Sequence, residues 1–267
     1  MHEWIVLFNV NQNISSWTID APLEKSRVYI IYDESGRVPF ELADSKRAII
    51  LHAYLKEYSD VLKSLSIAHF PLCCNSSVPE LPYIPIQSRK INVFYSGNLH
   101  AGRTKLFQAL TGWHALPLSV LSRVHRFFRL KFDSKFKNSY IRFSGGFGQG
   151  LNNIEYAKAL SESKIILSPP GISNDECFRH YEGLRAGCIV IAERLPPKPF
   201  LENSPIITVT DWTKGFDEIA RLLSDENALA HRSQLSRDWH LNNFSVTGVS
   251  NYIQRTLSDF SSTNPLQ

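Results

Sequence analysis

Short apolar runs rich in β-branched residues alternate with amphipathic segments over most of the chain after residue 90. The apolar runs are bounded by turn residues and predict strands at 91–95, 141–144, 164–168, 188–192 and 206–209. Apolar residues at helical spacing predict helices at 104–110, 118–132, 152–163, 174–186, 216–223, 228–239 and 249–260. Strands that alternate with helices are typical of βαβ units, which build a parallel sheet covered by helices.

The first 88 residues repeat this alternation in a weaker form. Apolar runs predict strands at 4–10, 28–32, 48–51 and 68–72, with an amphipathic segment at 55–65. We therefore expect a small α/β layer with its own parallel sheet. Ligands of such sheets bind at the carboxyl ends of the strands. Asp33 and Glu34 follow the second strand and His52 follows the third, so we expect them near a cleft.

A proline-rich stretch separates these two regions. Residues 76–88 contain Pro79, Pro82 and Pro85, and they predict an interdomain linker. The pattern therefore predicts a small N-terminal α/β domain at 1–88 and a larger Rossmann-like domain at 89–240. Residues 241–267 are expected to hold a terminal helix.

The stretch from 164 to 194 combines a strand, a turn, a helix and a second strand. Ser173 and Glu176 have the spacing of a capping box, in which each side chain binds the backbone amide of the other, so a helix is expected to begin near Asn174. Gly187 suits a left-handed helix end. A helix that starts after a strand presents free amides and a positive dipole, which together favour a phosphate group.

Two polar residues inside this helix are candidates for binding a nucleotide. Arg179 lies near the helix start, beside Ser173 and Asn174, and Glu182 lies about 12 Å along the helix axis from Ser173. A carboxylate at that depth can accept hydrogen bonds from both hydroxyls of a ribose. An ordinary solvated pair of charges on the helix surface explains the same spacing equally well.

A matching corner occurs earlier in the chain. The run 91–95 stops at Ser96, Gly97 and Asn98, and Arg103 stands at the start of the next helix. Because the carboxyl ends of parallel strands share one edge of the sheet, Arg103 is expected on the same edge as Ser173 and is a second candidate for binding phosphate. The helix dipole disfavours a cation at this end, which itself suggests an anionic partner.

The residues from Pro170 to Val190, PGISNDECFRHYEGLRAGCIV, resemble the signature of the exostosin-type glycosyltransferases (family 47). The matching segments are Cys177-Phe178-Arg179 and the run from Glu182 to Ile189, while Gly183 replaces the usual alanine and Val190 the usual proline. The resemblance implies an α/β fold of the GT-B kind, with two Rossmann-like domains facing a cleft. It also implies that Glu182 binds the donor ribose and that Arg179 and Arg103 bind the diphosphate. Gly97, Asn98, Ser173 and Asn174 complete the predicted donor site. In such enzymes the terminal helix crosses back to the N-terminal, acceptor-side domain.

Composition narrows the class of protein. Among 267 residues, 43% are hydrophobic and 12% aromatic, which excludes a disordered or fibrous chain. The formal net charge of +4 suits an anionic ligand and is too small to demand nucleic acid. The four cysteines show no C-x-x-C pair and are expected to be reduced. No run approaches the ~18 apolar residues of a membrane span, and the start lacks the basic residues of a signal peptide, so we expect a cytoplasmic protein.

Two further segments have an open interpretation. The segment 118–132 is a basic amphipathic helix, which is found on membrane surfaces and nucleic acids but more often forms a domain face with solvated charges. The glycines between 145 and 150 match neither a dinucleotide-binding fingerprint nor a Walker loop. Phe147 in that loop can stack on a base, although a plain turn explains the loop as well.

These features predict an inverting glycosyltransferase that acts on a nucleotide-diphosphate sugar. The resemblance implies a UDP-linked sugar, with UDP-xylose one candidate, and a hydroxyl group of a glycan as acceptor. No D-x-D motif occurs, so we expect no metal and no other cofactor. Asp33 or Glu34 is the candidate base. The alternatives are a nucleotide-sugar or glycan-binding module without catalysis and, less favoured because G-x-G-x-x-G is absent, a nicotinamide oxidoreductase.

Overall fold

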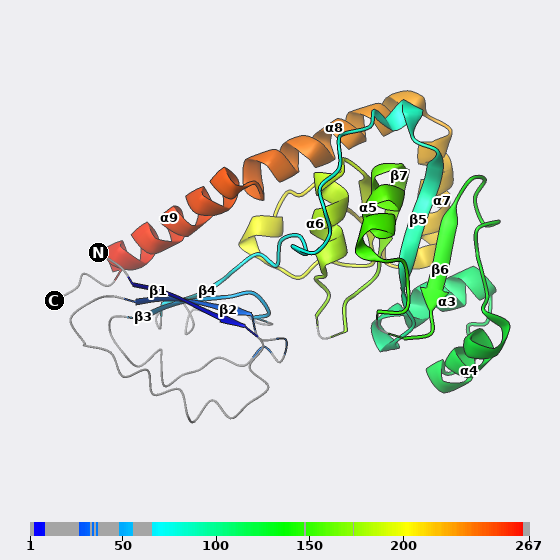
Figure 1. Ribbon diagram of the computed structural model, residues 1–267, viewed down its shortest axis with the longest axis horizontal. Helices are drawn as coiled ribbons and strands as arrows, with labels where there is room; N and C mark the ends of the chain where they lie inside the picture. The colour runs from blue at the N-terminus through cyan, green and yellow to red at the C-terminus, as the bar shows by residue number, and fades with distance from the viewer. Residues whose placement is uncertain are drawn as a thin grey trace. The chain divides into compact units, whose positions relative to one another are not determined.

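The computed structural model describes residues 3–8, 27–32, 34, 36, 48–55, 66–146, 148–172 and 174–263, with only the backbone for 3–8 and 261–263. Contacts group the chain into two compact units (Figure 1). The first unit comprises Met1–Leu72, Pro197–Glu202 and Ser245–Gln267, and the second comprises Cys73–Pro196 and Asn203–Phe244. The sequence predicted boundaries after 88 and 240, whereas these contacts divide the chain after 72 and 244.

The first unit contains a four-stranded parallel sheet. Its strands are β1 (Glu3–Phe8), β2 (Arg27–Tyr32), β3 (Ala48–His52) and β4 (Ile67–His69). They lie in the order β1-β2-β3-β4, the order of the sequence. All five residues of β3 are buried, as expected for a strand covered on both faces. The four predicted strands are confirmed.

Two later segments complete the first unit. Helix α9 (Val246–Thr263) confirms the predicted terminal helix, and the hydroxyl of Tyr252 in it donates a hydrogen bond to the carbonyl of His69, 2.7 Å away. The short helix η4 (Pro199–Leu201) follows Lys198, whose buried ammonium donates to the carbonyl of Ala53 at 2.9 Å. The carbonyl groups of Ala53 and His69, at the end of the sheet, are therefore bonded within the unit.

The second unit contains a five-stranded parallel sheet. Its strands are β5 (Ile91–Asn98), β6 (Tyr140–Ser144), β7 (Ser163–Ser168), β8 (Ile189–Ala192) and β9 (Ile207–Thr208). The order is β6-β5-β7-β8-β9, so the chain reverses direction across the sheet after β6. The reversal places a topological switch point between β5 and β7, the usual location of a ligand crevice in such sheets.

Helices cover both faces of the second sheet (Figure 1). One face carries α3 (Thr104–Thr111), α4 (Leu118–Phe128) and α7 (Trp212–Leu223). Leu106, Leu121 and Trp212 from these helices pack with Val93 and Ile165 in one apolar core. The other face carries α5 (Asn153–Ser161) and α6 (Phe178–Arg185), and α8 (Glu226–Asn243) packs against α6. All the predicted strands and helices of this unit are confirmed, with shifted ends.

The start of α6 differs from the prediction. The helix begins at Phe178 with Cys177 as its N-cap, so the predicted start near Asn174 was wrong. The ring Nδ1 of His180 accepts a hydrogen bond from the Cys177 amide at 3.1 Å, while the carboxylate of Glu176 accepts one from the hydroxyl of Tyr181. An imidazole thus does the capping that the pattern assigned to a carboxylate. The predicted left-handed end at Gly187 is confirmed, with φ of +67°.

The coil before β5 is fastened to the second unit. Arg89 is buried, and its guanidinium donates to the carbonyls of Ser163 at 2.7 Å and Ala186 at 2.6 Å. Arg185 in α6 donates to the carbonyl of Val78 at 2.9 Å. The segment 76–88, predicted as a linker and ending in η2 (Ile86–Ser88), therefore lies in the second unit.

Candidate functional site

Strands β5 and β7 end side by side at the switch point of the second sheet. β5 ends at Gly97 and Asn98, and η3 (Ala101–Arg103) follows it. A Cβ atom on Gly102 would lie 2.8 Å from the carbonyl oxygen of Gly171, in the loop that follows β7. A side chain at this position would collide with backbone, so glycine lets the two loops meet at the edge of the sheet.

Two arginines converge on Gly97. A Cβ atom on this glycine would lie 2.7 Å from Nη1 of Arg103 and 3.0 Å from Nη2 of Arg179. Arg103 donates through Nη1 to the backbone carbonyl of Asn98 at 2.8 Å and to its side-chain oxygen at 2.7 Å. Arg179 donates to the carbonyl of Ser96 at 2.9 Å. The structure therefore gathers four of the residues that the sequence predicted for a donor site, Gly97, Asn98, Arg103 and Arg179.

The two guanidinium groups are buried, and the carboxylate of Glu182, one turn along α6, is a partial countercharge to Arg179. Each residue is only 8% exposed, and within the described residues neither forms an ion pair with a carboxylate. The Nε atoms of Arg103 and Arg179 are also buried without a hydrogen-bond partner there. Burial lowers the pKa of Arg103, and the nearby Arg179 charge lowers it further. Since buried charges are normally paired, this arrangement favours an anionic ligand between the arginines.

His100 belongs to the same site and was not predicted from the sequence. Its Nδ1 accepts a hydrogen bond from the amide of Gly102 at 3.2 Å, so Nε2 carries the proton of the neutral ring. This Nε2 is buried without a partner among the described residues. Burial, Arg103 and Arg179 lower the pKa of His100 to about 4. The only sequence signal was its position in the corner between Asn98 and Arg103.

The loop between β7 and α6 contributes one more polar group. Asn174 is half-buried, and its side-chain nitrogen is a buried donor without a partner in the described part of the chain. Because α6 begins at Phe178, the Asn174 amide is not at the helix start as predicted. Ser173, the other predicted residue of this loop, lies outside the described residues.

Glu182 lies one helical turn beyond Arg179. It is 4% exposed, so the interpretation of these two residues as a solvated surface pair is wrong. Its carboxylate accepts hydrogen bonds from the hydroxyl of Tyr156 at 2.9 Å and from the amide of Asn75 at 3.4 Å. Burial raises the pKa of Glu182, and the Tyr156 hydrogen bond and the Arg179 charge offset part of that increase. The carboxylate keeps lone pairs for further donors.

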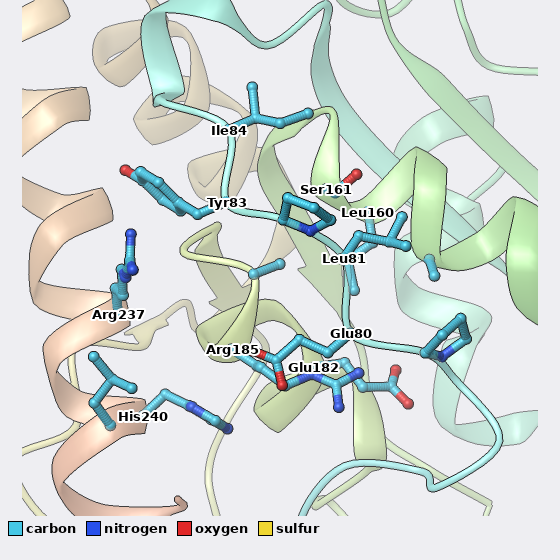
Figure 2. Close-up of a pocket in the computed structure, with 15 residues that line it drawn as sticks. Glu80, Leu81, Tyr83, Ile84, Leu160, Ser161, Glu182, Arg185, Arg237 and His240 are labelled. Atoms are coloured by element: carbon cyan, nitrogen blue, oxygen red, sulfur yellow. The ribbon is translucent and has the colours of Figure 1, made fainter.

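A pocket of about 190 Å³ opens beside Glu182. The coil 79–84, α5, α6 and α8 form its walls (Figure 2). Glu182 and Arg185 project from α6 next to Glu80, while Arg237 and His240 come from α8. Glu182 therefore lies one turn beyond Arg179 and also lines this pocket.

The predicted residues of the first unit are placed only in part. Glu34 is exposed in the turn after β2, and Asp33 lies outside the described residues, as does Phe147 of the glycine-rich loop. His52 is fully buried at the end of β3, where its Nδ1 accepts a hydrogen bond from the amide of Tyr54 at 3.1 Å. The assignment of Asp33 or Glu34 as catalytic base stays a prediction.

Three other predictions concern metals, cysteines and membranes. In the described ranges, no three side chains of His, Cys, Asp or Glu gather where they could hold a metal ion. All four cysteines are described and free, and Cys188 is buried. Among the described helices, none combines the length and the apolar character that crossing a bilayer requires.

Comparison with known proteins rests on structure alone, because no protein-family profile and no curated protein matches the sequence. A mutant of TarM from S. aureus, in complex with fondaparinux, α-GlcNAc-glycerol and UDP, aligns with a TM-score of 0.50 and 10% identity over 86% of this chain. A second TarM structure aligns with a TM-score of 0.51 and 11% identity over 88% of this chain. The structure of accessory secretory protein 1, 2 and 3 in Streptococcus pneumoniae aligns with a TM-score of 0.51 and 11% identity over 97% of this chain.

The chain spans about half the length of these solved structures. The alignments cover 55%, 54% and 54% of the three chains, respectively. At such low identity the likeness concerns the fold. It confirms the predicted fold class, in which Rossmann-like α/β units with parallel sheets follow the GT-B pattern. The chain thus has a glycosyltransferase-like fold, and its membership of the exostosin family stays a prediction.

Proposed function

We propose that the chain is an exostosin-like glycosyltransferase, which transfers a sugar from a UDP-sugar to a hydroxyl group of a glycan. The observation that carries this proposal is the pair of buried guanidinium groups at the switch point, Arg103 and Arg179, without a carboxylate partner among the described residues. The two arginines offer a diphosphate the charge that it requires. TarM, which shares the fold, was crystallised with UDP.

The donor occupies the second unit in this proposal. Its diphosphate binds between Arg103 and Arg179, where the Nε2–H of His100 and the side-chain amide of Asn174 supply two further donors. Its ribose hydroxyls donate to Glu182, one turn along α6. The fixed cations neutralise the charge that develops on the leaving diphosphate, so the reaction proceeds without a metal ion or another cofactor.

The transfer itself is proposed to invert the configuration of the sugar. The carboxylate of Asp33 or Glu34 takes the proton of the acceptor hydroxyl as its oxygen attacks the anomeric carbon. The bond from that carbon to the diphosphate oxygen breaks, and UDP leaves with the electron pair. UDP-xylose is one candidate donor, and another UDP-hexose or UDP-pentose is the alternative.

The test compares Arg179→Gln with Arg123→Gln, which removes an exposed cation of α4. Titration calorimetry measures UDP affinity, and release of UDP from a panel of UDP-sugars measures turnover. Loss of one donor that stabilises a developing charge costs about 10²–10³-fold in rate. We expect that loss for Arg179→Gln with the melting temperature retained, and wild-type behaviour for Arg123→Gln.

Other outcomes identify the alternatives. Wild-type UDP affinity and turnover in Arg179→Gln would contradict the proposed diphosphate site. Tight UDP binding without hydrolysis or transfer of any donor would indicate a binding module without catalysis. A thermal shift with NAD and none with UDP would indicate a nicotinamide enzyme instead.

A further inference from the structure

Tyr95 is a fully buried tyrosine of β5 that the site described above does not use. Its ring packs in the apolar core against Phe143, with the two ring centroids 4.7 Å apart. Its hydroxyl is also buried and has no hydrogen-bond partner among the described residues. Buried tyrosines usually have a partner for this group, because a buried donor without an acceptor destabilises the fold. The hydroxyl of Tyr95 therefore has a proton without an acceptor.

This hydroxyl lies where the two arginines of the candidate site converge. Side chains alternate along a strand, so Tyr95 and Gly97 lie on the same face of β5. A Cβ atom on Gly97 would lie 3.1 Å from the hydroxyl oxygen of Tyr95. The same atom would lie 2.7 Å from Nη1 of Arg103 and 3.0 Å from Nη2 of Arg179. A side chain at residue 97 would separate the three groups, and glycine allows them to meet at the end of the strand.

The arginines cannot accept the proton of this hydroxyl. A guanidinium group only donates hydrogen bonds, so neither Arg103 nor Arg179 supplies an acceptor. Burial raises the pKa of Tyr95, and the charges of Arg103 and Arg179 offset part of that increase, so the phenol keeps its proton at neutral pH. A hydroxyl oxygen that accepts a hydrogen bond from Arg103 can still donate its own proton. The hydroxyl is thus a third hydrogen-bond donor beside two cationic ones.

The ring and the hydroxyl of Tyr95 have different explanations. The guanidinium carbon of Arg179 lies 5.1 Å from the centre of the ring, within the range of a cation–π interaction. This contact and the core packing account for an aromatic ring at this position. A phenylalanine would provide the same ring face without a buried hydroxyl. Packing therefore explains the ring but does not explain the hydroxyl.

We propose that Tyr95 is a further diphosphate-binding residue, whose hydroxyl donates a hydrogen bond to an oxygen of the diphosphate held by Arg103 and Arg179. The inference rests on the proposed function and adds a residue to its diphosphate site. A phosphate oxygen supplies the missing acceptor, and a hydrogen bond to a charged group is stronger than one between neutral groups. A neutral donor also adds a contact without a third buried positive charge, which would be costly beside two guanidinium groups.

The alternative is that the hydroxyl acts through Arg103, by accepting a hydrogen bond that orients the guanidinium group. Nη1 of Arg103 already donates to the backbone carbonyl of Asn98 at 2.8 Å and to its side-chain oxygen at 2.7 Å. These two hydrogen bonds orient the guanidinium group without the tyrosine. Direct contact between the hydroxyl of Tyr95 and the ligand is therefore favoured.

The test introduces Tyr95→Phe into the full chain, which keeps the ring and removes only the hydroxyl. Titration calorimetry measures the affinities for UDP and for inorganic pyrophosphate. We expect both ligands to bind about tenfold or more weakly than to the wild type, the usual effect of losing a hydrogen bond to a charged group. The matched control is Tyr140→Phe in the neighbouring strand β6, which should leave both affinities unchanged.

Thermal unfolding of the ligand-free protein provides a second readout. Because the hydroxyl of Tyr95 is buried without a partner in the described part of the chain, Tyr95→Phe should keep or raise the melting temperature. Weaker binding together with equal or higher stability is expected for a group retained for its ligand, and a purely structural role does not produce it. A lower melting temperature with unchanged affinities would show that the hydroxyl serves the fold, and it would overturn the proposal.

A double variant separates direct contact from an effect through Arg103. In an Arg103→Gln background, Tyr95→Phe should still weaken pyrophosphate binding several-fold. Disappearance of the Tyr95→Phe effect in that background would overturn the direct contact. The proposed function can fail separately. Binding of pyrophosphate without binding of UDP would contradict the proposed function alone, whereas wild-type affinity of Tyr95→Phe for pyrophosphate would overturn this inference alone.

Discussion

The two sheets of this protein are both parallel, yet only one of them reverses its strand order. The first sheet runs β1-β2-β3-β4, whereas the second runs β6-β5-β7-β8-β9. Reversal makes the loops after two neighbouring strands diverge to opposite faces, and the gap between them holds ligands. Among the described strands the first sheet lacks such a gap. Strand order, which composition does not reveal, decides which sheet carries the candidate site.

The polar residues at the strand ends differ in the same way. At the end of β3 and β4, His52 and His69 are buried, and the pKa of His69 is lowered to about 3 by burial, by Lys198 and by His52. The carbonyl groups there accept hydrogen bonds from Lys198 and Tyr252. At the end of β5 and the loop after β7, by contrast, cations and imidazole nitrogens remain unpaired in the described part of the chain. The end of the second sheet therefore offers cationic donors to a ligand.

The largest predicted effect tests whether the first unit nevertheless takes part in the reaction. Loss of a general base costs about 10²–10⁴-fold in rate, so Asp33→Asn or Glu34→Gln should reduce turnover by that factor. UDP affinity, measured by calorimetry, should not change, because the proposed donor site lies in the second unit. Asp217→Asn, on an exposed residue of α7, is the matched control. Full turnover in both variants would restrict the chemistry to the second unit.

The next effect concerns the packing that holds α6 on the second sheet. A Cβ atom on Gly183 would lie 2.7 Å from Val190 and 2.8 Å from Ile166. Gly183→Ala should therefore destabilise the protein by about 1–3 kcal/mol in urea unfolding, and Val190→Ala in the same chain should restore part of this loss.

Gly215 in α7 provides the matched control for this measurement. Its nearest contact to an added Cβ is 3.4 Å, so Gly215→Ala should be neutral or stabilising by up to ~1 kcal/mol. Gly183 and Val190 are also the two departures from the exostosin pattern, and the structure shows them in contact. Equal stability of Gly183→Ala and the wild type would mean that the sheet and helix yield easily here.

A smaller effect is expected from Glu182→Gln. The amide replaces one acceptor oxygen by a donor, so affinity for UDP should fall about tenfold, the usual cost of a lost hydrogen bond to a charged group. The same substitution should reduce the affinity for 2′-deoxy-UDP by a smaller factor, because this nucleotide lacks one of the two ribose hydroxyls that Glu182 is proposed to bind. An equal loss for both nucleotides would place the ribose elsewhere.

The smallest effect is a pH dependence at His100. Because Arg103 and Arg179 help to lower its pKa to about 4, an anion that neutralises them should raise the pKa in the complex. The ring then takes up a proton on binding, and affinity for a UDP-sugar should increase about two- to fivefold as pH falls from 7.5 to 5.5. The diphosphate diester keeps its charge over this range. In His100→Gln the increase should disappear, and an unchanged slope would exclude His100 as its origin.

The sequence by itself determined where the elements lie and what type they are. When one face of an element is buried, apolar residues recur about every two positions in a strand and about every 3.6 positions in a helix. This local signal located the strands of the second sheet and the α-helices around it to within a few residues. It also placed Arg103 and Arg179 after strands whose carboxyl ends share an edge. These inferences need only residues that are close in the chain.

Tertiary structure alone decided what depends on distant residues. The partners of Glu182 are Tyr156 and Asn75, which lie 26 and 107 positions away. Helix α6 begins at Phe178 and not near Asn174, with His180 as the capping side chain. The sequence could not show this, because capping depends on side-chain geometry and not on residue type alone. Strand order and the burial of Arg103 and Arg179 beside Gly97 follow from how the elements pack. The hydrophobic periodicity of the sequence indicates that a residue is buried, but it does not indicate which side chains that residue contacts.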